Sequence, residues 1–293
     1  MVVRSGLILG LMLLGASLGE EALAQHALAS ALPTDTTVRK ATKPSREFSQ
    51  RQLRHDRVLA ARYEKRFAIK QLFRERNIPY PAEEVYIRIF KRERQLELWA
   101  RGAAQDTFAL LKRYEICALS DQLGPKRKQG DMQTPEGFYY IDDFNPRSGY
   151  HLSLHINYPN RSDQILGKGN LGGNIFIHGG CKTEGCMAVT DENIKEIYWV
   201  AVESRDNGQK RIPVHIFPAR LTDNNLAQLM NVFHDRPDLV SFWTNLKPGY
   251  DYFAKYKALP EVKVSALGRY ELATSAPATM LGTVIKSDSA KGN

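Results

Sequence analysis

A histidine and a cysteine stand eight positions apart within one short, glycine-rich stretch. From Asn174 to Thr190 this stretch reads Asn-Ile-Phe-Ile-His-Gly-Gly-Cys-Lys-Thr-Glu-Gly-Cys-Met-Ala-Val-Thr. His178 ends an apolar run typical of a strand, and Cys186 follows a glycine typical of a turn. A thiol beside an imidazole can be held as the thiolate, which attacks carbonyl groups. We therefore predict Cys186 as a nucleophile and His178 as its base.

This pair predicts acyl transfer from a peptide carbonyl. The thiolate would attack the carbonyl, and His178 would protonate the leaving amine, which leaves an acyl-enzyme. An amine acceptor then gives transpeptidation, whereas water gives hydrolysis. Two backbone N–H groups at the turn formed by Gly185 and Cys186 would stabilise the oxyanion, and one such donor is typically worth about 3 kcal/mol. Glycine at 185 would let the backbone approach the reacting centre closely.

The chain has three cysteines, so at least one thiol lacks a partner within the molecule. Cys117 lies in an apolar, strand-like run and fits a buried, inert thiol. Cys181 could pair with Cys186, which would abolish the chemistry, pair with Cys117, which would leave Cys186 free, or remain a loop thiol. Zinc ligation by His178, Cys181 and Cys186 lacks an evident fourth ligand. No metal and no other cofactor is expected.

Residues 1–24 are typical of a secretory signal peptide. Arg4 supplies the positive start, Gly6 to Leu18 form an apolar core too short for a comfortable membrane span, and Ala22-Leu-Ala24 fits the cleavage rule. An uncleaved anchor is the alternative. We expect a periplasmic protein that is soluble or peripheral to a membrane.

Basic residues gather near the start of the expected mature chain. Residues 38–76 hold thirteen Lys and Arg against four Asp and Glu, a surplus that equals the net charge of the whole chain, +9. Residues 25–45 are predicted to be a flexible leader. Near-helical spacing then predicts a basic helix up to residue 76 that turns these apolar residues inward: Leu53, Leu59, Tyr63, Phe67 and Phe73. A solvated charged face is the simpler interpretation; the other is attraction to an anionic membrane or wall surface. Nucleic acid is not an expected partner of an exported chain.

The middle of the chain predicts a β-rich domain. Strands are expected at 85–90, 95–99, 107–119, 138–141, 150–156 and 212–217, and a helix at 191–202. The glycine-rich run 167–173 lacks a Gly-Lys-Ser/Thr sequence, so we predict a bend or a mobile rim beside the site rather than a nucleotide site. After residue 220 we expect a helix capped by Thr222 or Asp223, two further helices at 239–243 and 250–256, and a disordered tail over 272–293.

Several segments together resemble the YkuD-type L,D-transpeptidase catalytic domain, most closely its YafK-like branch. The likeness covers roughly residues 78–264, and its most specific part is His178-Gly with Gly185-Cys. The other matching segments are Tyr86 to Lys91, Leu96 to Trp99, Leu123 to Lys126, Gly130-Asp131, Thr134 to Tyr139, Asn157 to Asn160, Trp243 to Lys247 and Gly249 to Phe253. The resemblance implies a mixed α/β fold, mainly β, with a β-sandwich-like catalytic domain over 77–220. An N-terminal basic helix would precede it, and helical additions over 221–271 would follow.

The resemblance also implies a substrate and roles for further residues. The substrate would be a peptidoglycan stem peptide, with the acyl-enzyme formed at its diamino-acid carbonyl and D-alanine leaving. Gly179, through its backbone, or Thr183 would orient the imidazole, and Gly185 would help to bind the oxyanion. Apart from the resemblance, the candidates for substrate binding are Tyr158, Asn160, Lys126, Lys168 and His155. Lys126, Lys168 and Arg88 could meet substrate carboxylates, although a solvated charge is the simpler interpretation of each, as packing is for His155.

The chain departs from many relatives at two places. It has Thr183-Glu-Gly-Cys where many have Ser-His-Gly-Cys, and Ala188 where Arg or Asn is frequent. Both departures are typical of the YafK-like branch, which the resemblance associates with hydrolysis or exchange of wall-peptide bonds. The acceptor is left open among a wall peptide, a free D-amino acid, a wall-attached lipoprotein and water. A non-catalytic wall-binding protein on the same fold is the alternative from another functional class.

Overall fold

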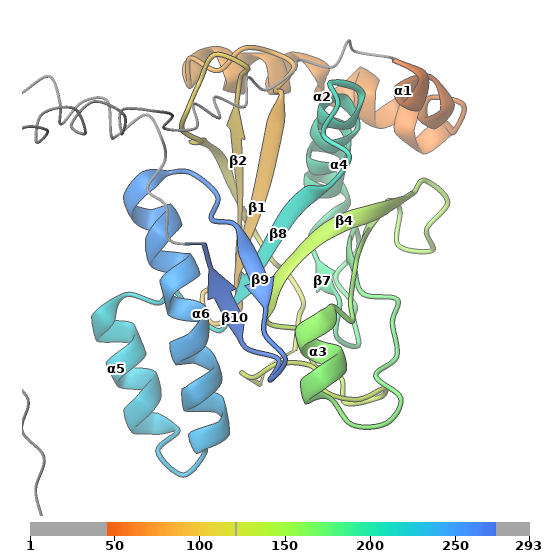
Figure 1. Ribbon diagram of the computed structural model, residues 1–293. Helices are drawn as coiled ribbons and strands as arrows, with labels where there is room; N and C mark the ends of the chain where they lie inside the picture. The colour runs from red at the N-terminus through yellow and green to blue at the C-terminus, as the bar shows by residue number, and fades with distance from the viewer. Residues whose placement is uncertain (1–45, 121, 274–293) are drawn as a thin grey trace, which may run out of the picture. The chain divides into compact units, whose positions relative to one another are not determined.

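The computed structural model describes residues 46–120 and 122–273, so the predicted signal peptide, the leader over 25–45 and the tail beyond 273 lie outside the described residues. The helices and strands follow one another as shown in Figure 1. Their bounds are α1 Glu47–Gln52, α2 Asp56–Glu75, β1 Glu84–Phe90, β2 Gln95–Arg101, β3 Ala109–Glu115, β4 Gly137–Asn145, β5 Ser153–Ile156, α3 Arg161–Leu166, β6 Phe176–His178, β7 Met187–Ala188, α4 Asp191–Asp206, β8 Ile212–Phe217, α5 Asp223–Val232, α6 Pro237–Tyr256, β9 Val262–Val264 and β10 Tyr270–Leu272.

One eight-stranded sheet forms the centre of the domain, in the order β3-β2-β1-β8-β4-β5-β6-β7. The predicted hairpin of β1 and β2 is present, from Glu84 opposite Arg101 to Phe90 opposite Gln95. β1 and β8 run parallel, as do β6 and β7, and the other neighbours run antiparallel. Twist accumulates across neighbouring strands, and Figure 1 shows β4 crossing the direction of β1. The predicted mixed α/β class is confirmed, with a single curled sheet where a sandwich was expected.

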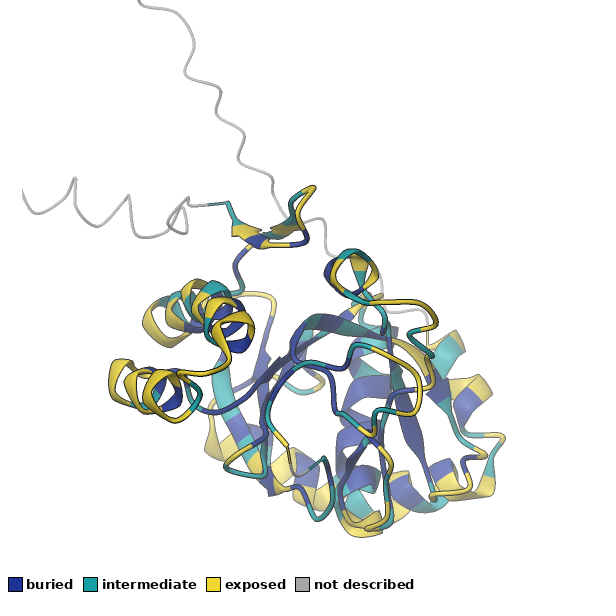
Figure 2. Ribbon diagram, turned by 90° about the horizontal axis from the view of Figure 1, so that it is seen from below, coloured by how far each residue is buried: buried dark blue, intermediate teal, exposed yellow. Residues whose placement is uncertain are grey.

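Helices cover both faces of the sheet centre. α1, α2 and α4 share a core with one face, and α5 and α6 share a second core with the other. Along β1, Ile87 and Ile89 join the first core and Phe90 joins the second, so alternate side chains are buried on opposite sides. Figure 2 shows these strands buried while the outer sides of the helices are exposed. Every residue of β1 after Glu84 is therefore buried, polar side chains included.

Arg88 illustrates this burial, because it lies beneath aromatic rings rather than at the substrate. Its guanidinium carbon is 4.6 Å from the ring centre of Tyr250 and 4.9 Å from that of Phe253. The side chain is 4% exposed, which removes it from the substrate-binding candidates. Contact with ring faces stabilises a desolvated cation.

The orientation of α2 differs from the prediction. Its buried residues are Val58, Ala61, Ile69 and Phe73, which pack in the core that α4 shares. Three residues predicted to face inward are exposed instead: Leu59 by 49%, Tyr63 by 72% and Phe67 by 70%. Both sets have helical spacing, and only one of them can face the domain. Leu53 packs against the core and Phe73 is buried in it, as predicted.

A single helix, α6, replaces the two helices predicted at 239–243 and 250–256, and it contains Pro248. Proline inside a helix costs about 3 kcal/mol or more. Burial of a continuous apolar face offsets this cost, because these residues of α6 are buried along its length: Leu239, Phe242, Trp243, Leu246, Tyr250 and Phe253.

The other C-terminal predictions have mixed outcomes. Thr222 caps α5 by accepting a hydrogen bond from the N–H of Asn225 at 3.3 Å, as predicted. The extension after residue 220 is not wholly helical, because β9 and β10 pair antiparallel at its end. The tail predicted to start at residue 272 therefore overlaps β10, whose last residue is Leu272. The predicted helix after Thr190 is confirmed as α4, with Ile194 and Ile197 fully buried.

A buried ion pair fixes the loop between β3 and β4. Lys91 Nζ lies 3.0 Å from Glu136 Oε1, and both side chains are 0% exposed. The ammonium also donates to the carbonyl groups of Gly124 at 2.8 Å and Thr134 at 3.0 Å. Glu136 accepts from the N–H of Gly124 at 2.7 Å and from Trp243 Nε1 at 2.7 Å. Both ends of the loop over 124–136 are thus held by one pair of buried charges.

Within residues 46–120 and 122–273, none of the helices combines the length and the apolar character that a membrane crossing requires.

Candidate active site

The register of two short parallel strands brings the predicted pair together. Ile177 lies opposite Met187, and His178 lies opposite Ala188. Ile177 and Met187 are fully buried in the main core, so the alternate residues of both strands point to the other face. Cys186 directly precedes β7 and shares the parity of Ala188. The sulfur and the imidazole therefore emerge on the same side of neighbouring strands.

A disulfide fixes the loop that leads to Cys186. Cys117 and Cys181 are bonded across 64 positions, with their Cα atoms 5.4 Å apart. The N–H of Cys117 also donates to the carbonyl of Ala188 at 2.9 Å. Cys186 remains a free thiol. Of the pairings that the sequence left open, this is the one compatible with chemistry at Cys186, and it removes Cys181 as a zinc ligand.

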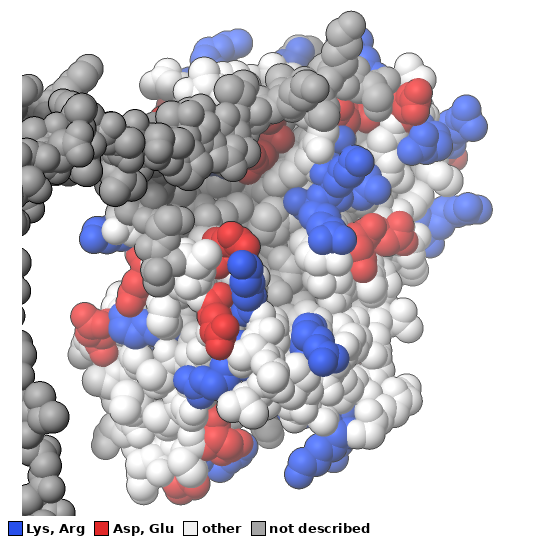
Figure 3. Space-filling model, viewed as in Figure 1, with Lys and Arg blue, Asp and Glu red and all other residues white. Residues whose placement is uncertain are grey.

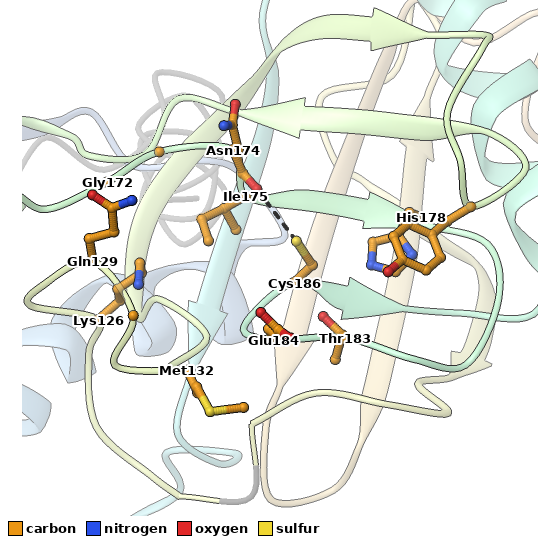
Figure 4. Close-up of a pocket in the computed structure, with 13 residues that line it drawn as sticks. Lys126, Gln129, Met132, Gly172, Asn174, Ile175, His178, Thr183, Glu184 and Cys186 are labelled. Carbon is orange, nitrogen blue, oxygen red and sulfur yellow. Dashed lines mark hydrogen bonds between the residues drawn. The ribbon is translucent and has the colours of Figure 1, made fainter.

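Cys186 and His178 line one cavity of about 480 Å³ (Figure 4). Four segments contribute: the loop over 124–136, Tyr150 before β5, the glycine-rich loop before β6, and the loop from β6 to β7. The lining residues are Lys126, Gln129, Gly130, Met132, Tyr150, Gly172, Gly173, Asn174, Ile175, His178, Thr183, Glu184 and Cys186. The glycine-rich run thus ends at the rim of the site, where the sequence placed it.

His178 is held in one orientation by its neighbours. Its Nδ1 lies 2.6 Å from the carbonyl oxygen of Gly179, which can only accept, so Nδ1 carries the proton and Nε2 is the basic atom. The ring of Tyr150 lies against the imidazole, with centres 4.6 Å apart and a tilt of 32°. His178 is 3% exposed, and this burial lowers the pKa of the imidazole although the hydrogen bond to Gly179 opposes the shift.

The thiol of Cys186 points toward the glycine-rich side of the cavity. Sγ donates to the carbonyl oxygen of Asn174 at 3.5 Å, the bond dashed in Figure 4, and accepts from the N–H of Phe176 at 3.4 Å. Among the described residues it makes no hydrogen bond to His178. Burial raises the pKa of the Cys186 thiol, while the N–H of Phe176, the hydroxyl of Thr183 and the charge of Lys126 lower it in part.

Burial thus acts on both groups in the direction that favours a neutral thiol and a neutral imidazole. A raised thiol pKa and a lowered imidazole pKa both disfavour transfer of the proton from sulfur to nitrogen. Rotation of the Cys186 side chain away from Asn174 toward His178 would let Nε2 take that proton.

The neutral pair has a measurable pH dependence. His178 with a lowered pKa stays a neutral base below its ordinary value of 6.5, so the acid limb of kcat/KM should lie below pH 6.5. Without substrate, alkylation of Cys186 by iodoacetamide should increase with pH through a midpoint above the ordinary thiol value of 9.0. Peptide mass spectrometry of the alkylated protein measures this midpoint against free cysteine. Fast labelling that does not change with pH near neutrality would instead indicate a resting ion pair.

The turn at Gly185 exposes backbone donors beside the thiol. Gly185 has a φ of 117°, in the region that favours glycine. The N–H groups of Gly185 and Cys186 find no backbone acceptor in the part of the chain that the structure describes. They are therefore available to bind an oxyanion of the kind that would form if Cys186 attacked a carbonyl.

Gly185→Ala should disturb this turn strongly. A Cβ at this position would lie 2.8 Å from the carbonyl oxygen of Gln133, and the positive φ would be strained as well. We expect a loss of more than about 1 kcal/mol in the free energy of unfolding and a fall in turnover of at least about tenfold through lost oxyanion contacts. Gly173→Ala is the matched control in the same cavity, because its nearest neighbour, the oxygen of Tyr158, is 4.0 Å away. Equal effects of the two substitutions on thermal unfolding and turnover would contradict this role of the turn.

Thr183 and Lys126 both line the cavity. Thr183 Oγ1 is buried and makes no hydrogen bond of ordinary geometry within the described residues. Such a group is costly to leave unsatisfied, which makes it available to a ligand. Lys126 is 5% exposed, and its Nζ contacts Asp131 Oδ1 at 2.6 Å and the carbonyl of Lys128 at 2.9 Å. Lys126 therefore contributes positive potential at the cavity wall while remaining paired.

The other substrate-binding candidates do not line the cavity. Tyr158 is buried, and its hydroxyl donates to the carbonyl groups of Lys126 and Leu171, each at 3.4 Å. Asn160 caps α3, where its side chain accepts from the N–H of Asp163. His155 Nδ1 lies 2.5 Å from Asp142 Oδ1, and Lys168 is exposed on the glycine-rich loop. Tyr158 and Asn160 lie in a segment that matches the family, but their side chains support neighbouring loops rather than line the cavity.

Sequence reasoning missed the residues that loops deliver to the cavity. Tyr150 shields His178, the carbonyl of Asn174 holds the thiol, and Gln129, Met132 and Glu184 complete the walls. No periodicity or motif marks them. Of these residues, Asn174 and Glu184 lie inside the stretch that the sequence singled out.

Comparisons with known proteins agree with this geometry. The YkuD family model, described as the L,D-transpeptidase catalytic domain, matches residues 84–216. The "Putative L,D-transpeptidase YafK" of Escherichia coli K12 is 40% identical over 188 residues, which cover 64% of this chain and 72% of that protein. Its counterpart in strain O157:H7 gives the same values.

Solved structures show a more distant likeness. The helical cell shape determining protein Pgp2 from Campylobacter jejuni is 19% identical with a TM-score of 0.39, over 62% of this chain and 73% of that one. Bd1075 of Bdellovibrio bacteriovorus is 17% identical with a TM-score of 0.35, over 67% of this chain and 85% of that one. On the strength of the family match and the 40% identity to YafK, this chain belongs to the YkuD family of L,D-transpeptidase catalytic domains.

Proposed function

We propose that this protein is a cysteine-dependent L,D-transpeptidase that acts on peptidoglycan stem peptides. The observation that carries the proposal is the free thiol of Cys186, which shares one cavity wall with an oriented, buried His178. Family membership supports the general reaction class. The residues that line the cavity suggest which group would perform each step of the reaction.

The reaction begins when a stem peptide enters the cavity and displaces the thiol from Asn174. Cys186 rotates toward His178, Nε2 takes the thiol proton, and sulfur attacks the carbonyl carbon of the diamino-acid residue. The N–H groups of Gly185 and Cys186 stabilise the tetrahedral oxyanion. His178 then gives the proton to the departing amine of D-alanine, which leaves a thioester on Cys186. The carbonyl of Gly179 stabilises the imidazolium that forms between these transfers.

The second half of the cycle runs the same groups in reverse. An acceptor amine reaches the thioester, His178 takes its proton as the new amide bond forms, and the thiol leaves. Water in place of the amine would release the free acid. A wall-attached lipoprotein or a cross-linked peptide that carries the same acyl bond would enter the same cycle as a donor.

The charges of the cavity suit a zwitterionic peptide. Glu184 and Lys126 lie on its wall, one of each sign. A stem peptide carries carboxylates and, on its diamino acid, an ammonium group, so each charge finds a complement.

We also propose a periplasmic location. The features that support it are the signal-like residues 1–24 and the disulfide between Cys117 and Cys181, since disulfides persist mainly in oxidising compartments.

Incubation of the purified protein with defined wall fragments tests the proposed function. Tetrapeptide-bearing fragments are supplied alone, with a free D-amino acid, or with a second stem peptide, and mass spectrometry follows products and the protein itself. We expect release of D-alanine, a thioester adduct on the peptide containing Cys186, and an amide product with one of the acceptors. Release of free acid alone would make the protein a hydrolase of the same bond. Binding of fragments without any adduct or product would instead indicate a wall-binding protein.

A further inference from the structure

The exposed face of α2 carries two parallel rows of side chains. Leu59, Tyr63 and Phe67 are spaced four residues apart and form the apolar row, exposed by 49%, 72% and 70%. Residues four apart lie on one side of a helix, one turn above another. At 1.5 Å per residue, the row extends over roughly 12 Å of the helix surface. Large exposed apolar side chains in such a contiguous row mark an interaction surface.

The second row is basic and runs beside the first. It comprises Arg62, Arg66, Lys70 and Arg74, again four residues apart. None of the four lies within ion-pair distance of a carboxylate in the described part of the chain. By contrast, cationic and anionic side chains are interspersed on the face of the molecule seen in Figure 3.

Arg66 joins the two rows. Its guanidinium lies 4.6 Å from the ring centre of Phe67 and 5.6 Å from that of Tyr63, and its Nε is buried without a hydrogen-bond partner among the described residues. On the far side of the apolar row, Glu64 is already bound by Lys195 at 2.7 Å. Arg62 and Lys70 lie over the rings of Trp199 and Tyr80 and act electrostatically on Glu203. The positive charge left for an external anion is therefore greatest at Arg66 and Arg74.

The opposite side of α2 is fixed to the domain. Val58, Ala61, Ile69 and Phe73 are buried in the shared core, and Lys65 pairs with Glu192 of α4 at 2.6 Å. The helix cannot turn its apolar row inward without exposing these residues. The exposed face is thus a stable feature of the folded protein.

We propose that this face of α2 docks the protein on an anionic phospholipid bilayer. The apolar row inserts at the headgroup boundary, where aromatic side chains are favoured, and the basic row contacts lipid phosphates. A hydrated wall polymer would match the basic row and could stack sugar rings on Tyr63 or Phe67, but it offers no apolar phase for the whole row that also includes Leu59. A second copy of the same face would oppose like charges. The two rows together therefore favour a lipid surface over both.

Sedimentation with vesicles tests the proposal on the full chain. Vesicles contain phosphatidylcholine alone or phosphatidylcholine with phosphatidylglycerol. We expect Tyr63→Ser with Phe67→Ser, and separately Lys70→Glu with Arg74→Glu, to weaken partitioning onto the anionic vesicles by at least about tenfold each. Binding of the wild-type chain should also fall as salt is raised. The charge-matched control, Lys210→Glu with Lys255→Glu, changes exposed lysines on other elements and should partition like the wild type.

The docking surface would be refuted if both α2 variants partitioned like the wild type. It would also be refuted if the control lost as much binding as the variant with Lys70 and Arg74 changed. Binding to isolated cell wall that depends on α2, with no such dependence for vesicles, would identify a wall polymer as the partner instead. Self-association that disappears in the Tyr63 and Phe67 variant, without vesicle binding, would identify a second copy. Turnover on soluble wall fragments should be unchanged in every variant, which separates this test from that of the proposed function.

Discussion

Cys186→Ala is expected to lower the formation of both transfer and hydrolysis products by at least about a thousandfold, because the thioester cannot form without sulfur. The substitution removes one partly buried atom, so the fold should remain. Cys186→Ser should be equally inactive, since a hydroxyl is far harder to deprotonate than a thiol and burial already weakens His178 as a base. Mass spectrometry of products and of the adduct, with thermal unfolding in parallel, measures both effects.

Two further variants show whether the thiol and the imidazole act as one unit. His178→Gln should lose most of the activity, and the double variant should be no slower than Cys186→Ala alone, since groups that share one step are not additive. Turnover of Cys186→Ala within tenfold of the wild type would refute the assigned nucleophile. If the activity losses of the two single variants multiplied in the double variant, His178 would act at another step of the cycle.

Glu136→Ala is expected to cost about 3–5 kcal/mol in the free energy of unfolding, because it leaves the buried ammonium of Lys91 without a counter-charge. Burial lowers the pKa of Lys91, and Glu136 is the main group that opposes this shift. The variant also removes the acceptor of Trp243 Nε1 and of the N–H of Gly124. Chemical denaturation followed by tryptophan fluorescence measures the loss.

An exposed pair provides the control for this buried one. Glu261 and Lys263 lie 3.2 Å apart with side chains 64% and 69% exposed, so Glu261→Ala should cost less than about 1 kcal/mol. Adding Lys91→Met to Glu136→Ala should recover part of the stability by removing the unpaired charge. Equal losses for Glu136→Ala and Glu261→Ala would show that the buried pair contributes no more than a surface pair.

That His178 and Cys186 share one cavity could be predicted from the sequence because the information is local. An apolar run ending in His178 and a glycine before Cys186 suffice to suggest a strand end and a turn, and the parallel register of β6 and β7 does the rest. The state of the pair could not be predicted in the same way. The pKa of each group depends on burial by loops that are distant in sequence, and the thiol binds Asn174 instead of the imidazole.

Contacts between elements distant in sequence explain where the observed packing differs from the expected one. The apolar residues of α2 form two helical sets, and α4 selected the one with Val58 and Phe73 while leaving Tyr63 and Phe67 exposed. Two helices were predicted at 239–243 and 250–256, yet α6 continues through Pro248 because its apolar face packs along the whole length. His155 and Lys168 looked available for substrate, but nothing in the sequence shows that they lie away from the cavity. Side-chain direction at such positions depends on packing between elements.

The disulfide between Cys117 and Cys181 has a consequence for the newly made chain. Cys181 precedes Cys186 by five positions, whereas its native partner is 64 positions away, so chance encounter favours the inactive pairing. Only when β7 has docked beside the segment holding Cys117 does the longer bond become the accessible one. Formation of the native bond therefore competes with a pairing that would consume Cys186, and only molecules that reach the longer bond keep a free thiol at Cys186.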